Sequence, residues 1–387
     1  MRALVVNAEW KPRESYSITE EERSRRRAFT GSQVWRNSVF EIKDIPIPSL
    51  AESDEVLIRV KRCGICGSDT HLYETDKEGY ILFSGLTKLP CVIGHEFSGI
   101  VEETSANVKN LKRGDKVAVE SVMWCGRCQS CRSGFPNQCS NVELMGLSAN
   151  GAFAEYVAVS ERYCWKINNL AGVYSEDEVF DIGSLIEPVG CAYNGIFVVG
   201  GGFNPGAVVV VYGVGSIGLG AIAIARIAGA SQIIAFDVID ERLKIAKDLG
   251  ADHAFHIGKL DGCRPRDKVM ELTGGWGADI QVEAAGAAPR TIPEMERSMA
   301  VNGKIIYLGR SSLSVAVHLD IFVSGANKII GARGHSGHTV FPSIVKLIAS
   351  GKLKLEKMIT ARYPFERIMD AIQVSSSRKD GKILVKM

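Results

Sequence analysis

"AVVVVYGVGSIG", residues 207–218, joins two local patterns that together indicate a fold. An apolar, strand-like run is followed at once by Gly213-x-Gly215-x-x-Gly218, and Ile217 lies inside the motif. Glycines at this spacing, between a strand and a helix, allow a tight turn and a close approach of a dinucleotide pyrophosphate to the backbone. The stretch therefore predicts a dinucleotide-binding turn, and glycines that serve only helix–strand packing are the alternative.

The residues that follow this turn alternate between strand and helix patterns. "SQIIAFD" (231–237) and "NGKIIYLG" (302–309) are strand-like, whereas "DERLKIAKDLG" (240–250) has helical spacing and ends in glycine. Such alternation is typical of a parallel sheet that is covered by helices on both faces. We expect one α/β domain, a doubly wound parallel Rossmann sheet, over residues 191–333.

An acidic residue stands where this kind of domain contacts the ribose of its cofactor. Asp237 ends the next strand, nineteen residues after Gly218. A carboxylate there accepts hydrogen bonds from the ribose hydroxyls and repels a 2′-phosphate, which favours NAD over NADP. Arg242 is near enough to weaken that preference.

Residues 1–190 show a different pattern. Short strands alternate with glycine-rich turns, as in "EVLIRVKRCGICGSD" (55–69) and "GAFAEYVAV" (151–159). This pattern predicts a β-rich, barrel-like domain. Residues 334–387 hold a helical pattern and then a short strand, and we expect them to return to the first domain.

Composition and charge exclude several classes of function. Hydrophobic residues make up 46% of the 387-residue chain, charged residues 23%, and the net charge is +2, so no global field attracts nucleic acid or membrane. No apolar stretch reaches the ~18 residues of a membrane span. The basic run "EEERSRRR" (20–27) offers the i,i+4 pairs Glu21–Arg25 and Glu22–Arg26, so we interpret it as a solvated helix face. With no secretory signal visible, we expect a cytoplasmic protein.

Cysteines are dense in "WCGRCQSCRSGFPNQC", residues 124–139. In a reducing compartment a disulfide is disfavoured, and a redox pair would use two cysteines where four are present. The spacing suits four thiolates around one tetrahedral zinc ion, which leaves no open position for a substrate. An iron–sulfur cluster is the other metal interpretation. The four candidate ligands are Cys125, Cys128, Cys131 and Cys139.

A second metal site would need ligands elsewhere. Cys66 lies in "CGICGSDTH" (63–71), His95 and Glu96 are adjacent in "GHEFSG" (94–99), and Glu187 stands in "LIEP". Cysteine, histidine and carboxylate form a three-ligand set that leaves room for a substrate oxygen. A buried structural histidine and a turn with a salt bridge are the alternative.

Taken in order, these motifs resemble those of the zinc-dependent medium-chain dehydrogenases, the group of alcohol, sorbitol and threonine dehydrogenases. The resemblance covers nearly the whole length. "GHEFSGIVEETSANV" (94–108) follows the family's zinc signature except at Ser105, where glycine or alanine is usual, and residues 124–139 match its structural-zinc lobe. The resemblance implies a GroES-like catalytic domain beside the Rossmann domain, NAD as cofactor and two zinc ions per chain, one catalytic and one structural.

The resemblance also implies a role for particular residues. Cys66, His95 and Glu96 become ligands of the catalytic zinc, and Glu187 ligates it directly or through water. Ser68 and His71 match the family's proton relay. Along the cofactor the family would place two segments, Ala284–Gly286 with Ala285 at its centre, and Leu308–Arg310.

Within the family, the strongest resemblance is to cyclitol dehydrogenases that act on scyllo-inosose. Four stretches carry it, together with an N-terminal insertion at about residues 10–38: "GSQVWR" (31–36), "DKEGYILFSGLT" (76–87), "GSLIEP" (183–188) and "GHSGH" (334–338). It implies a polyol or cyclitol substrate and a homodimer or homotetramer. A sorbitol-type or threonine-type enzyme stays open, and so does a non-catalytic nucleotide-binding relative, although such a relative typically loses catalytic zinc ligands that are present here.

Overall fold

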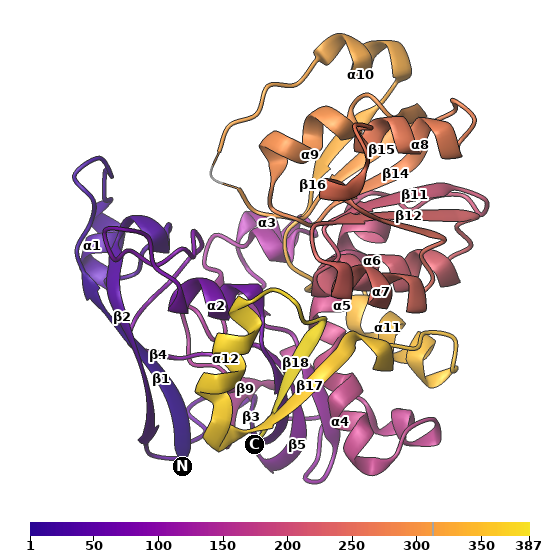
Figure 1. Ribbon diagram of the computed structural model, residues 1–387. Helices are drawn as coiled ribbons and strands as arrows, with labels where there is room; N and C mark the ends of the chain where they lie inside the picture. Colours follow the sequence, from indigo (N-terminus) through magenta and orange to yellow (C-terminus); the bar gives the residue numbers. More distant parts are fainter. Residues whose placement is uncertain (312) are drawn as a thin grey trace. The chain divides into compact units, whose positions relative to one another are not determined.

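The computed structural model describes residues 1–311 and 313–387, which form two compact units. Unit 1 comprises residues 1–187, 361–377 and 383–387, and unit 2 comprises residues 188–360 and 378–382. Figure 1 shows the chain coloured from the N-terminus to the C-terminus, with many of the elements of both units labelled.

Unit 2 is built on a parallel sheet that six strands form within the described residues, in the order β13-β12-β11-β14-β15-β16. This order identifies the doubly wound Rossmann arrangement that the sequence predicts. Its strands are β11 (Val208–Tyr212), β12 (Gln232–Asp237), β13 (His253–His256), β14 (Ala278–Glu283), β15 (Met299–Tyr307) and β16 (Lys328–Gly331).

Helices cover both faces of this sheet, with α8, α9 and α10 on one side and α6 and α7 on the other (Figure 1). The apolar side chains of the central strands are therefore buried on two sides, and aromatic rings stack between neighbouring strands, with Tyr212 and Phe236 at 5.0 Å. The helices are α5 (Ile186–Tyr193), α6 (Ser216–Ile227), α7 (Asp240–Asp248), α8 (Pro265–Leu272), α9 (Ala288–Met295), α10 (Leu319–Gly325) and α11 (Val340–Ala349).

Unit 1 has a seven-stranded sheet among the described residues, in the order β10-β6-β5-β3-β18-β17, with β9 paired to β3. The ladders that join β3 to β5, β9 and β18 are antiparallel, and the inner faces of these strands form one large core. The strands are β3 (Glu55–Gly64), β5 (Glu96–Thr104), β6 (Lys116–Val119), β9 (Tyr156–Ser160), β10 (Cys164–Lys166), β17 (Ile359–Pro364) and β18 (Lys382–Lys386). This is the β-rich domain that the alternating pattern predicts.

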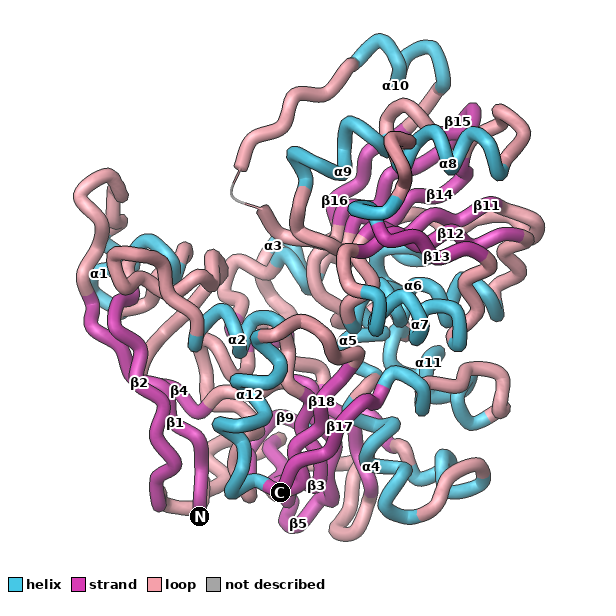
Figure 2. Tube along the Cα trace, viewed as in Figure 1, coloured by secondary structure: helices cyan, strands magenta, loops and turns pink. Residues whose placement is uncertain are grey.

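Smaller elements complete unit 1, and Figure 2 shows how much of it is loop. β1 pairs with β2 and β4 in a second sheet, and β7 pairs with β8. The strands are β1 (Arg2–Trp10), β2 (Trp35–Asp44), β4 (Cys91–Val92), β7 (Val122–Met123) and β8 (Glu143–Leu144). The helices are α1 (Glu20–Arg25), α2 (Gly67–Tyr73), α3 (Gln129–Arg132), α4 (Glu176–Ser184) and α12 (Ile368–Ser376).

The unit boundaries differ from the expected domain boundaries at the C-terminal end. Residues 334–360 belong to unit 2, although we expected all of 334–387 to return to the first domain. Helix α11 explains the difference, because it packs closely on α5. A Cβ atom on Gly190 would lie 3.4 Å from the Phe341 ring and 3.5 Å from Val340 Cγ1.

The N-terminal helix α1 is only partly the solvated face that its charges predict. The pair Glu21–Arg25 forms at 3.4 Å, but Glu22 is fully buried and accepts hydrogen bonds from Tyr16 and from the Phe29 backbone. The prediction that Glu22 pairs with Arg26 on a solvated helix face is therefore wrong. Arg26 is instead the left-handed residue that ends the helix, with φ 46°.

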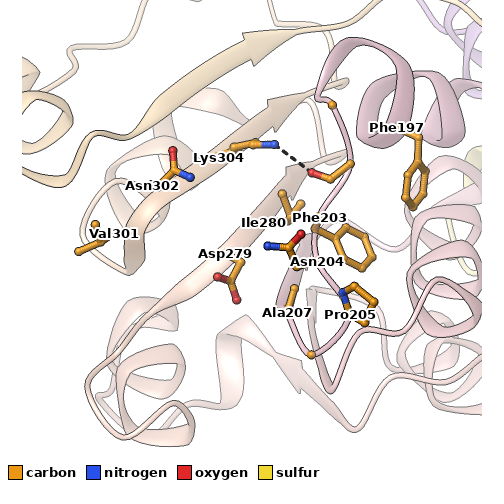
Figure 3. Close-up of a pocket in the computed structure, with 13 residues that line it drawn as sticks. Phe197, Phe203, Asn204, Pro205, Ala207, Asp279, Ile280, Val301, Asn302 and Lys304 are labelled. Carbon is orange, nitrogen blue, oxygen red and sulfur yellow. Dashed lines mark hydrogen bonds between the residues drawn. The ribbon is translucent and has the colours of Figure 1, made fainter.

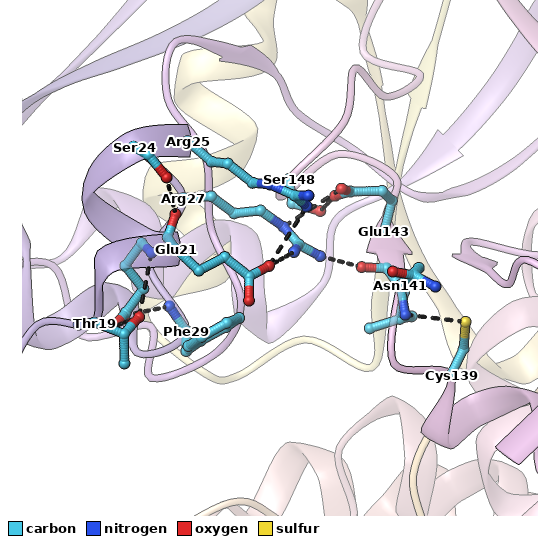
Figure 4. Close-up of polar contacts among 12 residues, drawn as sticks. Thr19, Glu21, Ser24, Arg25, Arg27, Phe29, Cys139, Asn141, Glu143 and Ser148 are labelled. Atoms are coloured by element: carbon cyan, nitrogen blue, oxygen red, sulfur yellow. Dashed lines mark hydrogen bonds and ion pairs between the residues drawn. The ribbon is translucent and has the colours of Figure 1, made fainter. Parts of the chain in front are cut away.

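Arg27 is also buried and joins this helix to the loop after the cysteine-rich stretch. Its guanidinium donates to the Val142 carbonyl and lies 3.6 Å from Glu21 and 3.4 Å from Glu143 (Figure 4). A buried guanidinium such as that of Arg27 requires polar partners on several sides. The charge pattern of a helix does not reveal these partners, because they lie elsewhere in the sequence.

Across the described residues, no single helix has the length and apolar composition to cross a membrane. One pair of helices, Glu176–Ser184 with Ile186–Val199, passes on those two criteria when taken together, and it is bent by 41°.

Candidate metal and cofactor sites

Four cysteine sulfurs gather in the lobe that follows β7. The Sγ atoms of Cys125, Cys128, Cys131 and Cys139 all lie within 4.8 Å of one another. Backbone amides point at these sulfurs, since the N–H groups of Cys125 and Asn141 each donate to Cys139 Sγ at 3.3 Å. These N–H groups favour the thiolate form of Cys139, but burial has the larger effect and raises the pKa of this thiol.

The electrostatics of the lobe also favour thiolates at two positions. Hydrogen bonds from the Ser140 hydroxyl and from backbone amides lower the pKa of Cys128 to about 5. Backbone amides of Arg127 and Cys128 lower the pKa of Cys125 to about 7. Four mutually close cysteines, two of them predisposed to ionise, fit a closed tetrahedral zinc site.

A second group of ligand atoms combines Cys66, His95 and Glu96, again within 4.8 Å of one another. Strand pairing explains their proximity, because Gly64 at the end of β3 is paired with Glu96 at the start of β5. Two residues after Gly64, the chain turns at Cys66 into helix α2. Gly94 makes the approach to His95 possible with φ +90°, where a Cβ atom would lie 2.7 Å from the Phe153 ring.

Asp69 supports two of these three residues from behind. It is fully buried, its Oδ2 accepts the Cys66 N–H at 2.9 Å, and its Oδ1 lies 3.8 Å from His95 Nδ1. A carboxylate behind a ligating histidine fixes the orientation of the ring and raises its basicity. The opposite ring nitrogen, His95 Nε2, lies 3.4 Å from Ser68 Oγ.

Glu187 has a different environment from Glu96. Its carboxylate accepts a hydrogen bond from Ser121 Oγ at 2.8 Å and is 7% exposed. Within the part of the chain that the structure describes, the group of close ligand atoms includes Glu96 and does not extend to Glu187. The geometry therefore favours Glu96 over Glu187 as the third member of the ligand set.

Negative charge converges on His95. Burial by itself lowers the pKa of His95, but the negative charges of Cys66, Asp69 and Glu187 raise it well above its ordinary value. The same field would attract a divalent cation. A thiolate, an imidazole and a carboxylate, with a hydroxyl beside them, fit a catalytic zinc site that keeps an open position.

The glycine-rich turn of unit 2 has the geometry that its motif predicts. Gly213 has φ +84°, and a Cβ atom there would lie 2.5 Å from Ala285 Cα. A Cβ atom on Gly218 would lie 2.0 Å from the Gly213 carbonyl oxygen, so only glycine permits this packing of helix on strand. Gly215 is the N-cap of α6, and Ile217 lies in the first turn of that helix.

Asp237 joins this turn to the end of β12. Its carboxylate accepts the Val214 N–H at 2.7 Å on one oxygen, and the amides of Val238 and Ile239 on the other. An ionised carboxylate has about four acceptor positions, so three hydrogen bonds leave capacity for a ribose hydroxyl. Arg242 lies close to the turn, with Nη1 3.6 Å from the Cβ position of Gly215 and Nε bonded to the Asp380 carbonyl at 2.8 Å.

Glu283 contacts the two segments that the family resemblance would place along the cofactor. Its backbone carbonyl accepts the N–H groups of Leu308 and Gly309, at 2.9 and 2.8 Å. Its fully buried carboxylate accepts the Ala287 N–H at 3.2 Å, and burial raises the pKa of this group. Ala285 and Leu308 are thereby held at the carboxyl ends of β14 and β15, where ligands bind in this fold.

A separate hollow of about 430 Å³ lies in unit 2 and is shown in Figure 3. It is lined by residues near the amino ends of β11 and β14, such as Ala207 and Asp279. Lys304 Nζ donates to the carbonyls of Gly200 and Gly202 at its rim, at 2.7 and 2.9 Å. The cofactor turn lies at the carboxyl ends of the strands, so we assign this hollow no part in cofactor binding.

Sequence reasoning missed three supporting residues: Asp69, Ser121 and Glu283. Asp69 had a detectable signal, because it stands three residues after Cys66 and caps the same helix. Ser121 and Glu283 act through contacts with Glu187 and with residues 286–309, which only the folded chain brings near. His71 lies on α2 three residues after Ser68, so the two share a helix face.

Comparisons with known proteins agree with this architecture. Residues 52–169 match the alcohol dehydrogenase GroES-like domain, and residues 216–350 match the zinc-binding dehydrogenase domain. A scyllo-inosose 3-dehydrogenase of Thermotoga maritima is 38% identical, with 96% of each chain covered. An L-threonine 3-dehydrogenase of Bacillus licheniformis is 33% identical, over 88% of this chain and 93% of its own.

Solved structures are similar over the whole length. A structure described as a putative alcohol dehydrogenase from Thermotoga maritima has a TM-score of 0.95 and 37% identity, with both chains fully covered. A structure described as a short chain alcohol dehydrogenase from Escherichia coli CFT073, complexed with NADH, has a TM-score of 0.79 and 28% identity, covering 100% of this chain and 99% of its own.

A Rossmann unit joined to a GroES-like unit with two thiolate-containing ligand groups defines the class of zinc-type dehydrogenases. The chain belongs to the medium-chain, zinc-binding alcohol dehydrogenase family. It is therefore an oxidoreductase of the zinc-binding dehydrogenase type.

Proposed function

We propose that this enzyme oxidises a secondary hydroxyl of a cyclitol or polyol, of the scyllo-inosose class, with NAD as the hydride acceptor. The observation that carries the proposal is the group Cys66, His95 and Glu96, with the Ser68 hydroxyl 3.4 Å from His95. The 38% identity to a scyllo-inosose 3-dehydrogenase over 96% of both chains supports the choice of substrate class.

The residues of this group would each have one task. Zinc held by Cys66, His95 and Glu96 would supply a Lewis acid that makes the substrate hydroxyl more acidic, while NAD would supply the hydride acceptor. Ser68 Oγ accepts the proton of that hydroxyl. His71, one turn further along α2, passes the proton toward solvent.

Residues that contact the proposed zinc ligands hold these ligands in place. Asp69 keeps the Cys66 backbone and the His95 ring in position, and Ser121 holds the Glu187 carboxylate beside the ligand set. Cys125, Cys128, Cys131 and Cys139 would hold a structural zinc and take no part in the reaction. Thiolate ligands favour a reducing compartment, which supports a cytoplasmic location.

A threonine-type dehydrogenase is the second candidate, because L-threonine 3-dehydrogenases match at 31–35% identity. Such an enzyme needs a group that holds the substrate ammonium. The test is NADH formation on a panel of inositols, linear polyols and L-threonine, together with NADH consumption on scyllo-inosose. Preferred turnover of the cyclitols supports the proposal, and preferred turnover of L-threonine would replace it.

We further propose that the enzyme is a homodimer or homotetramer that associates through β16. This strand is at one end of the unit 2 sheet, and Ile329 on it is 46% exposed. Leu319 and Val323 on α10 are 74% and 79% exposed. An apolar sheet edge left open to water is an aggregation hazard, and pairing with the same edge of a second copy would remove it.

A further inference from the structure

The loop after helix α2, residues 74–83, leaves the helix and returns to it. The Leu82 N–H donates to the carbonyls of His71 and Glu74, at 2.9 and 3.1 Å, and the Phe83 N–H donates to His71 at 3.1 Å. A bridge between Thr75 and Ile81 closes the loop at its base. Residues 74–83, here called the relay loop, are therefore fixed to the end of the helix that carries Ser68 and His71.

The tip of the relay loop is held by the N-terminal segment, residues 11–34. Arg13 forms ion pairs with both Asp76 and Glu78, and its guanidinium lies 3.8 Å from the centre of the Tyr80 ring. Arg13 Nε donates to the Ser32 carbonyl at 3.3 Å, which ties the arginine back to its own segment. One guanidinium thus uses its planar donors and its flat face at the same time.

Neighbouring contacts continue this attachment along the loop. Arg36 Nε donates to the Glu78 carbonyl at 2.7 Å, and the Ile81 N–H donates to the Trp35 carbonyl at 3.2 Å. Further on, Ala28 and Thr87 exchange two backbone hydrogen bonds at 2.8 and 2.9 Å. The relay loop is therefore attached both to the N-terminal segment, through Arg13, and to the start of β2, through Trp35 and Arg36.

One apolar side chain of the relay loop stays exposed. Ile81 and Phe83 are 1% and 9% exposed, while Leu82 between them is 42% exposed. Its backbone is bonded to His71, which lies one helical turn from Ser68, a rise of about 5 Å. The Leu82 backbone is therefore joined to the end of the helix that carries the residues proposed to move the substrate proton.

We infer that Leu82 forms an apolar side of the substrate pocket, and that Arg13 fixes this side by holding the relay loop. The inference rests on the proposed function and makes Leu82 a specificity-determining residue and Arg13 a positioning residue. A cyclitol with equatorial hydroxyls presents C–H groups on its ring faces, and such a face suits a leucine side chain. A short linear alcohol has no ring face to place there.

The first experiment compares kcat/KM for a cyclitol with kcat/KM for a short linear alcohol. In Leu82→Ser this ratio should fall about tenfold, as expected when an apolar pocket loses a contact of a methylene or more. Arg13→Met keeps the apolar stem but loses the ion pairs, so the ratio should fall in the same direction, while KM for NAD is unchanged. Arg25→Met is the matched control, because Arg25 is exposed and pairs with Glu21 on its own helix.

The second experiment measures how firmly the relay loop is held, and it does not depend on enzymatic turnover. Hydrogen exchange at the Leu82 and Phe83 amides should be faster in Arg13→Met and in the milder variant Glu78→Gln, and unchanged in Arg25→Met. Unaltered exchange in both variants would overturn the role of Arg13. An unaltered substrate ratio in Leu82→Ser, with normal zinc content, would overturn the role of Leu82. If the parent enzyme oxidises no alcohol on the panel, the proposed function fails, and the exchange rates still decide the role of Arg13.

Discussion

At the scale of single residues, the candidate active site shows how a few buried groups can define a reaction. Asp69, Glu96 and Glu187 are all less than 10% exposed, and charges buried to this extent require compensation. A divalent cation among Cys66, His95 and Glu96 would provide it. The same arrangement explains why Asp69, which touches no substrate, belongs to the site.

We expect Asp69→Asn to weaken zinc binding without removing any ligand. The amide would lose the charge behind His95, and changes of this kind typically cost 10–100-fold in metal affinity. Competition with a chelator measures the effect, with Asp44→Asn on the exposed end of β2 as the control. An affinity equal to that of the parent would show that Asp69 does not support the metal.

Asp237 is the residue that we propose to govern the choice between NAD and NADP. We expect Asp237→Ala to raise kcat/KM with NADP relative to NAD, because the repulsion of a 2′-phosphate is removed while Arg242 remains nearby. KM for NAD should also rise, since the Val214 N–H loses its acceptor. Steady-state kinetics with both cofactors check this. An unmoved ratio would mean that Asp237 does not face the ribose.

At the scale of elements, the N-terminal segment shows where sequence reasoning succeeds and where it fails. The Rossmann strands, the glycine turn and the four-cysteine stretch follow local patterns, so the sequence predicts them, whereas the grouping of Cys66 with His95 and Glu96 is implied by the family resemblance. The acidic residues of α1 also follow a local pattern, but Glu22 is buried by Tyr16 and Phe29, which lie outside the helix. The attachment of Arg13 to residues 76–80 depends on contacts across more than sixty positions, for which no local pattern exists.

The buried Glu22 should make the free energy of unfolding depend on pH. Burial raises the pKa of Glu22, but hydrogen bonds from the backbone of Thr19 and Phe29, and from Tyr16, lower it overall. A carboxylate with a depressed pKa contributes stability above its unfolded pKa, and that stability is lost as pH falls through the folded value. Glu22→Gln should therefore lower the free energy of unfolding by roughly 2 kcal/mol at neutral pH, and by less in acid.

Denaturant unfolding at a series of pH values measures this difference. Glu20→Gln is the control, because Glu20 is exposed in the first turn of the same helix. If Glu22→Gln and Glu20→Gln are equally stable at neutral pH, or if the gap between them widens in acid, the assigned role of Glu22 is contradicted.

At the scale of the whole molecule, the candidate metal sites and the candidate cofactor turn lie in different units. Unit 1 holds both cysteine-containing ligand groups, and unit 2 holds the glycine turn with Asp237. The sequence predicts this division, because each motif lies within one unit. It does not predict that residues 334–360 belong to unit 2, since the packing of α11 on Gly190 depends on the tertiary fold.

The exposed strand β16 at the edge of the unit 2 sheet leads us to predict that two copies of the chain associate through it. A lysine at Ile329 would place a charge on the outer strand of the sheet, where it opposes edge-to-edge pairing. We expect Ile329→Lys to reduce the molar mass in solution by half or more, as measured by light scattering, while the zinc content stays unchanged. A parent enzyme that is already monomeric, or a variant of unchanged mass, would exclude this interface.

The central claim is that Cys66, His95 and Glu96 form a catalytic zinc site distinct from the four-cysteine site. Zinc content and turnover of Cys66→Ala, measured beside His71→Ala, test it most directly. Cys66→Ala should fall from two zinc ions per chain toward one and lose turnover at every pH. His71→Ala should keep two zinc ions and lose activity by about 10²–10⁴-fold, with recovery as pH rises and hydroxide accepts the proton. A Cys66→Ala variant that keeps both zinc ions and most of its turnover would contradict the claim.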